Sequence, residues 1–247
     1  MRSRLQPQEG RAVSNGRRAI RLSHRYGYVA GLYRLRSNTG KFSKTERLIA
    51  LTGTLGRAMI IIDSKFIGDF KIGDNINHNL KILEVLYKQY AAANDEEKRL
   101  VCKPIIVLLV SLIDAVFYDL HTRIKTFTIE GVENIIASSI EYIRTRKKMD
   151  DLEKYIASAK KHGLIEPPND KFYDGLDELR KLRNRIHIQN TKKYPPRNEY
   201  DAFTGDKKLL AEKAVEKTFR AMAKTYARKL DYVESFNLPW DAHFPNG

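Results

Sequence analysis

The sequence predicts an all-α protein, a helical bundle preceded by a basic N-terminal arm. Apolar residues recur every three or four positions through most of the chain from residue 43 onward, which is the period of an amphipathic helix. Strand signals are few, and no internal repeat is visible. Hydrophobic residues make up 42% and charged residues 30% of the 247 positions, which suits a soluble globular domain with a substantial core.

The positive charge is concentrated at the N-terminus. Residues 1–44 hold eleven lysines and arginines against one acid, Glu9, and so carry ten of the fifteen net positive charges. Residues 1–42 are rich in Gly, Ser and Arg and show no sustained period, so we expect a disordered or loosely ordered arm. Tyrosines interleave with arginines over residues 24–36, which suits either weak RNA contact or a tail lying on the domain. The arm resembles a transit peptide in composition, but it lacks an amphipathic stripe, and we interpret it as a basic extension.

Cysteine content and hydropathy indicate the cellular compartment of the protein. Cys102 is the only cysteine, which excludes an intramolecular disulfide and a cysteine-based metal cluster. We therefore expect a reducing, cytoplasmic location, a buried Cys102 and no cofactor. The apolar run 104–117 is too short to span a bilayer and contains Asp114, so it predicts a buried core helix and no membrane partner.

The first half of the domain predicts three helices. An apolar stripe over 48–66 indicates a helix beginning near Ser43, although residues 59–63 alone could be a short strand. Residues 68–75 predict a turn, followed by a second helix that ends near residues 91–95. A third helix begins at Asp95 and reaches about Lys125, and Pro104 should kink or divide it.

The second half predicts four more helices. One begins at Val132 and runs to about residue 148, and another covers 150–165 and is stopped at Gly163. Asp170 or Asp174 should cap the next helix, which an exposed loop over 190–206 follows. Asp206 should cap a long last helix that reaches about residue 236. The predicted organisation is therefore an arm (1–42), one helical domain (43–235) and an irregular tail (236–247).

The stretch "LDELRKLRNRIHIQN", residues 176–190, carries the clearest chemical pattern. On a helix, positions three, four and seven apart share a face. One side would then present polar groups, namely Arg180, Arg183, Asn184 and His187. The other side would pack through Leu179, Leu182 and Ile186. Arginine binds phosphate oxygens through two parallel hydrogen bonds and histidine exchanges a proton near neutral pH, so this face suits an RNA phosphodiester. A plain solvated helix face is the alternative.

An all-α core with "LRKLRNRIH" on a late helix resembles the HEPN superfamily over about residues 76–232. That family's signature is an arginine followed by a polar residue, with four to six residues between the arginine and a histidine. Arg183 and Asn184 match the dipeptide, but only three residues separate Arg183 from His187. Six residues separate Arg180 from His187, but Lys181 then fills the polar position. Either arginine can therefore correspond to the family's arginine.

The resemblance implies a HEPN-like bundle and a metal-independent RNA endonuclease, of the kind found in phage defence and toxin systems. RNA would be the substrate, and a homodimer would join two motif helices in a composite site, with an antitoxin or regulatory protein as a further partner. His187 would be the general base or acid, and Arg180 and Arg183 would bind phosphate. Asn184 would orient the reacting groups. Asp114 and Tyr118, on the third helix, could orient the histidine, although Asp114 could equally satisfy local hydrogen bonds.

Two other functions compete with catalysis. The same resemblance includes non-catalytic modules that dimerise through these helices and bind RNA or a protein partner. A scaffold that binds nucleic acid through its basic arm is the third hypothesis. His187 decides between the first two, because only the nuclease requires it.

Overall fold

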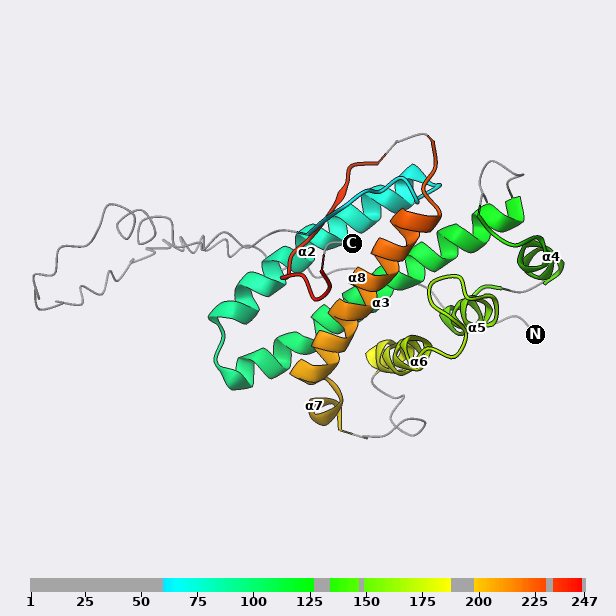
Figure 1. Cartoon of the computed structure of the whole chain (residues 1–247). Coiled ribbons are helices and arrows are strands. Elements are labelled where there is room, and N and C mark those ends of the chain that lie inside the picture. Colours follow the sequence, from blue (N-terminus) through cyan, green and yellow to red (C-terminus); the bar gives the residue numbers. More distant parts are fainter. Residues whose placement is uncertain (1–59, 127–133, 147–148, 188–197, 230–232, 246–247) are drawn as a thin grey trace, which may run out of the picture. The chain divides into compact units, whose positions relative to one another are not determined.

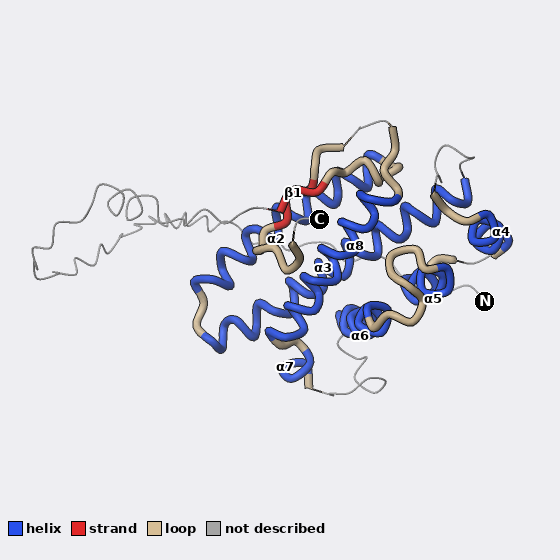
Figure 2. Tube along the Cα trace, in the orientation of Figure 1, coloured by secondary structure: helices blue, strands red, loops and turns tan. Residues whose placement is uncertain are grey.

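The computed structural model describes residues 60–126, 134–146, 149–187, 198–229 and 233–245. The chain divides into two units, and all of these residues belong to the second, Thr52–Gly247. This part is mostly helical, which confirms the predicted helical character (Figures 1 and 2). The arm predicted for residues 1–42 lies outside the described residues. The helices are α2 (Phe70–Ala92), α3 (Asp95–Thr126), α4 (Ala137–Thr145), α5 (Leu152–His162), α6 (Phe172–Arg183), the short 3₁₀ helix η2 (Asn184–Ile186), α7 (Glu199–Ala202) and α8 (Gly205–Thr225), and the strands are β1 (Ile60–Ile62) and β2 (Phe236–Leu238).

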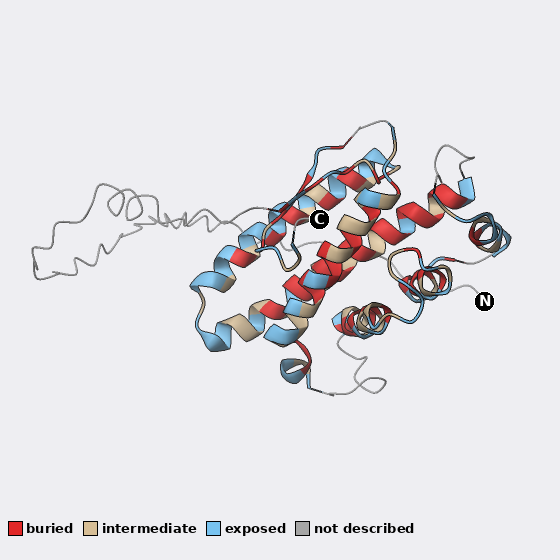
Figure 3. Cartoon of the chain, viewed as in Figure 1, coloured by how far each residue is buried: buried red, intermediate tan, exposed pale blue. Residues whose placement is uncertain are grey.

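Helix α3 lies at the centre of the bundle. It contacts α2 and α8 on one side and α4, α5 and α6 on the other, and it is buried along most of its middle (Figure 3). The prediction of a core helix is confirmed by its buried residues from the run 104–117: Ile105, Ile106, Leu109, Val110, Leu112, Ile113, Val116 and Phe117. Cys102 is buried as predicted. By length and composition α3 could also cross a membrane, but half of its most apolar window is buried inside the protein.

Pro104 does not divide α3, which continues from Asp95 to Thr126. A proline inside a helix removes one backbone hydrogen bond and crowds the preceding turn. Here Cys102 and Ile105 on either side are buried against neighbouring helices. Tertiary packing on both sides therefore holds the helix together through the proline.

Helix α2 begins earlier than the predicted turn over 68–75 allows. Asp69 is its N-cap, and the Asp69 side chain accepts a hydrogen bond from the Lys71 backbone N–H at 2.8 Å. The carboxylate of Asp119 on α3 accepts from the backbone N–H groups of Gly68 and Asp69, at 2.9 and 3.0 Å. These bonds satisfy donors that would otherwise oppose helix initiation. The turn therefore ends at Asp69.

A two-stranded antiparallel pair closes the bundle and corrects two expectations. Residues 60–62 form β1, which agrees with the short-strand alternative for 59–63 and not with a helix through 66, and Ile60 pairs with Leu238 while Ile62 pairs with Phe236. The segment 236–247 was expected to be irregular, but its first three residues form β2. Alternating burial explains the strand: Ile60 and Ile62 are buried, whereas Ile61 is 65% exposed. The partner strand lies far away in the sequence, so local periodicity did not reveal it.

Helices α4 and α5 differ in how well the sequence placed their ends. The chain turns at Asn134, which has a positive φ of 68°, and α4 begins only at Ala137. The predicted start at Val132 lies outside the described residues. Helix α5 ends as predicted at Gly163, which has φ 59° and donates its backbone N–H to the Ala159 and Lys160 carbonyls. Glycine adopts this left-handed conformation without the strain that a Cβ would add.

The structure around α7 and α8 differs from the predicted loop over 190–206 and from the predicted cap at Asp206. The region 190–206 contains the short helix α7, and Thr204, not Asp206, is the N-cap of α8. Asp206 lies in the first turn of α8 instead. Helix α8 ends at Thr225, before the predicted end near 236, because the chain then turns toward β1. The Arg228 N–H donates to the Lys65 carbonyl at 3.0 Å, a bond that a continuing helix could not make.

Candidate functional site

The motif helix α6 is fixed by its apolar face. Neither predicted aspartate is its N-cap, because that position is taken by Lys171, which makes no side-chain cap hydrogen bond. Leu176, Leu179 and Leu182 are buried against α3, α5 and α8. The Asp170 carboxylate accepts a hydrogen bond from the backbone N–H of Phe172, the first helical residue, at 2.7 Å. Asp174, the other predicted cap, lies inside the first turn. The packing face of α6 was therefore readable from the sequence through Leu182.

The α-helix stops within the motif. It ends at Arg183, and Asn184, Arg185 and Ile186 form the 3₁₀ helix η2. His187 follows with extended backbone, φ −80° and ψ 102°. The tighter winding of a 3₁₀ helix changes which side chains share a face. The predicted face of four polar residues is therefore interrupted after Arg183.

The break also exposes an apolar side chain. Ile186 was expected to pack beside Leu179 and Leu182, but it is 52% exposed. Arg185, in contrast, is buried. The prediction for Ile186 is wrong because it assumed regular α-helical geometry through residue 187.

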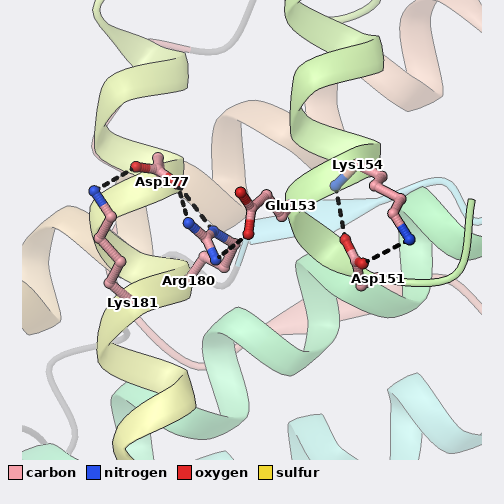
Figure 4. A network of polar contacts seen from close by, with 6 residues as sticks. All are labelled: Asp151, Glu153, Lys154, Asp177, Arg180 and Lys181. Atoms are coloured by element: carbon pink, nitrogen blue, oxygen red, sulfur yellow. Dashed lines mark hydrogen bonds and ion pairs between the residues drawn. The ribbon is translucent and has the colours of Figure 1, made fainter. Parts of the chain in front are cut away.

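Arg180 is buried between α5 and α6 and pairs with one carboxylate on each helix. Its guanidinium donates to Asp177 Oδ1 from Nε (2.9 Å) and Nη2 (2.7 Å), and to Glu153 Oε2 from Nη1 (2.8 Å). Figure 4 shows the Arg180 side chain reaching from α6 toward Glu153 on α5, with Lys181 on the other side of Asp177. The Arg180 side chain is only 8% exposed. Its position therefore suits holding α5 against α6 better than binding phosphate.

Arg183 is the more accessible of the two candidate arginines. Its Nη2 lies 3.1 Å from Asp114 Oδ2 on α3, and 37% of its side chain is exposed. The sequence left open whether Asp114 orients the histidine or satisfies local hydrogen bonds, and in the structure Asp114 pairs with Arg183. Burial raises the pKa of the Asp114 carboxyl above its ordinary value, and the charge of Arg183 partly offsets this rise. Asp114 thus holds Arg183 at the edge of the α3/α6 contact.

Tyr118 lies one helical turn beyond Asp114 and faces solvent. It is 49% exposed, and its ring meets that of Tyr155 on α5 edge to face, with centroids 6.5 Å apart. The Tyr155 hydroxyl donates to the Met149 carbonyl, and burial raises the pKa of Tyr155 to about 12. Tyr118 therefore borders the Arg183–Asp114 pair as an exposed aromatic ring.

Asn184 and His187 complete the predicted set. Asn184 is half-buried at the junction of α6 and η2, where its backbone N–H reaches the Arg180 and Leu182 carbonyls. His187 is exposed at the end of a described range. The structure thus brings Arg183 and Asp114 into contact, keeps Asn184 half-buried, leaves Tyr118 and His187 exposed, and buries Arg180.

A second histidine, His121, lies inside the α3/α5 contact. Its Nδ1 is 2.7 Å from the Phe117 carbonyl, and its ring lies 4.8 Å from that of Tyr155. Within the described residues its buried Nε2 has no hydrogen-bond partner. Burial lowers the pKa of His121 to about 4, so its imidazole is neutral at physiological pH.

Sequence reasoning also missed a cluster of buried carboxylates. Glu212 and Glu216 on α8 are 2% and 0% exposed, although glutamate is usually a surface residue. Their four-residue spacing beside the buried Ala211, Val215 and Phe219 was the available signal. Among the described residues, no group of three or more His, Cys, Asp and Glu side chains is arranged to hold a metal ion.

Comparison of the chain with protein-family models, with curated proteins and with solved structures found no match.

Proposed function

We propose that the region around Arg183 and His187 binds RNA and cleaves it without a metal ion, as a HEPN-like endonuclease would. The observation that carries this proposal is an accessible arginine that Asp114 holds at 3.1 Å, on the helix whose end presents an exposed histidine. Arg180 is removed from the reacting groups, because it is buried between two carboxylates.

The proposed reaction uses the nucleophile that RNA itself provides. His187 accepts the proton of a ribose 2′-hydroxyl, and the 2′-oxygen forms a bond to phosphorus. Arg183 stabilises the added negative charge of the phosphorane through its N–H groups. The bond between phosphorus and the 5′-oxygen then breaks, and that oxygen takes the proton that His187 had accepted. The products are a 2′,3′-cyclic phosphate and a 5′-hydroxyl.

A binding and dimerisation module is the second candidate, and exposed apolar groups favour it. Ile186 and Tyr118 are 52% and 49% exposed. They lie close in sequence to the two partners of the Arg183–Asp114 pair. A second copy of the chain could cover both groups, and this would bring two motif ends together.

Cleavage of mixed RNA in EDTA separates the two candidates. The parent protein should leave 2′,3′-cyclic ends, and His187→Ala should reduce the rate about 10²–10⁴-fold, the usual contribution of a general acid or base. Arg183→Ala should also reduce the rate, and His78→Ala, at an exposed position on α2, is the matched control.

Equal cleavage by the parent and His187→Ala would refute the proposed chemistry. If the parent does not cleave but dimerises in sedimentation, and Ile186→Asp dissociates the dimer, the module is the correct function.

A further inference from the structure

A pocket whose lining contains no residue of the motif carries features of its own. Its volume is about 300 Å³, and it is bordered by α2, the first turns of α3, α8 and the C-terminal segment. Three aromatic rings line it, those of Tyr87, Tyr90 and Trp240. Protein pockets for small ligands span roughly 300–1,000 Å³, so this one suits a compact molecule.

Trp240 contributes an unused hydrogen-bond donor. The residue is 4% exposed, and its indole Nε1 is buried without a partner in the part of the chain that the structure describes. A buried N–H that has lost its water costs free energy unless it finds an acceptor. An acceptor atom on a molecule in the pocket would satisfy it.

The buried acid of the pocket is already satisfied by the protein. Glu212 accepts hydrogen bonds from the Tyr87 hydroxyl and from Lys208 at 2.6 Å, and its second oxygen lies 3.1 Å from His243 Nε2. The ammonium of Lys208 lies 5.3 Å from the Tyr87 ring centroid and 4.9 Å from that of Tyr90. Glu212 and Lys208 therefore stabilise the pocket wall and leave ligand binding to other groups.

Lys98 is the cation of the pocket that can change partners. It contacts Asp95 at 3.5 Å, and the Asp95 side chain is fully exposed to solvent. An exposed ion pair of this length contributes little free energy. An acidic group on a ligand could therefore replace Asp95 at little cost.

We propose that this pocket binds a small aromatic anion, with its ring against Trp240 and Tyr87 and its acidic group at Lys98. The two rings lie next to each other, with centroids 5.8 Å apart and planes inclined by 34°, and each presents only a small part of its surface to the pocket, Tyr87 being 6% and Trp240 4% exposed. An acceptor atom on the ligand pairs with Trp240 Nε1. A nucleoside monophosphate and an aromatic carboxylate share this chemistry. The site is independent of the proposed RNA cleavage.

The protein contains its own probe, because Trp240 is its only tryptophan. Its fluorescence is measured in the full-length chain during titration with AMP, 4-hydroxybenzoate, adenosine and inorganic phosphate. At least one of the two aromatic anions should give a saturable change, and the one that does identifies the source. Adenosine and phosphate, which each lack half of the ligand, should bind at least tenfold more weakly.

Two substitutions test the assigned contacts. Lys98→Ala should weaken binding about tenfold, whereas Lys88→Ala, at an exposed lysine on α2 outside the pocket lining, should leave it unchanged. Trp240→Phe keeps an aromatic ring and removes the N–H, so calorimetry should show about tenfold weaker binding, with circular dichroism confirming the fold. His187→Ala should bind like the parent.

The proposal is wrong if neither aromatic anion gives a saturable signal, if phosphate binds as well as they do, or if both pocket variants retain the parent's affinity. Loss of binding in His187→Ala would also refute it. Failure of RNA cleavage would leave it unaffected, so the two proposals are tested separately.

Discussion

Two groups of paired charges, one on α8 and one around α6, differ in how completely water is excluded from them. On α8, the carboxylates of Glu212 and Glu216 are almost fully buried. On α6, Arg180 is buried too, but its partners Glu153 and Asp177 are 67% and 38% exposed. Arg183, beside it, keeps 37% of its side chain in solvent.

The buried carboxylates on α8 stabilise the structure, whereas the pairs around α6 keep contact with water. A buried charge must keep all its partners, because losing one leaves it desolvated and unpaired. A charge that keeps part of its side chain in water, as Arg183 does, loses less when its partner is replaced. The α8 cluster therefore holds the C-terminal segment in place, whereas Arg183 stays partly accessible to solvent.

Removing a buried carboxylate should produce the largest effect. Glu216 pairs with Arg220 at 2.9 Å and accepts from the backbone N–H groups of His243 and Phe244. Glu216→Ala leaves these donors unpaired, and we expect a loss of about 3–5 kcal/mol in the free energy of unfolding. Urea denaturation measures it, with the exposed Glu84→Ala as control, expected within about 0.5 kcal/mol. Equal losses in both variants would show that the buried carboxylate of Glu216 stabilises the fold no more than an exposed one.

The buried His121 should make stability depend on pH. Its folded pKa of about 4 lies below the ordinary value of 6.5, so the unfolded chain binds more protons between these values. Its contribution is complete above pH 6.5 and is lost as the pH falls to 4, by about 3 kcal/mol in total.

Urea denaturation across this range measures the slope of stability against pH. His121→Phe should flatten it, because phenylalanine cannot be protonated, whereas the exposed His78→Gln should leave it largely unchanged. A slope unaltered by His121→Phe would show that another group governs the acid response.

Substitution of the two motif arginines should affect the free energy of unfolding and the RNA cleavage rate in opposite order. Arg180→Ala removes a buried guanidinium whose partners can regain water, so we expect a loss of about 1–2 kcal/mol, below the range for fully buried pairs. Arg183→Ala should cost at most about 1 kcal/mol, because its pair is partly exposed.

RNA cleavage should show the reverse order at a temperature where both variants are folded. Arg183→Ala should lose activity and Arg180→Ala should retain it. Activity that depends on Arg180 instead would identify it as the phosphate-binding arginine.

The smallest effect is expected at Asp69, the N-cap of α2, which lies inside the turn predicted for residues 68–75. Asp69 accepts from the Lys71 N–H at 2.8 Å at the start of α2. Asp69→Ala should cost about 1 kcal/mol, the usual value of an N-cap. Asp74→Ala, at an exposed position inside the same helix, should change stability by less than about 0.5 kcal/mol. Thermal unfolding of the two variants gives the comparison.

Local patterns predicted the elements whose determinants are close in sequence. Helix α3 was recognisable from its apolar run and its start at Asp95, and the end of α5 from Gly163. The packing face of α6 followed from Leu176, Leu179 and Leu182. In each of these cases the residues that form the element also carry its signal.

The sequence by itself determined the helical character, the central helix and the residue types of the motif. Only the tertiary structure decided which charges are buried, because that depends on partners far along the chain. Arg180 is held by Glu153 on α5, Arg183 by Asp114 on α3, and β1 by a strand near the C-terminus. Desolvation acts on atoms that folding brings together, and no local period encodes it.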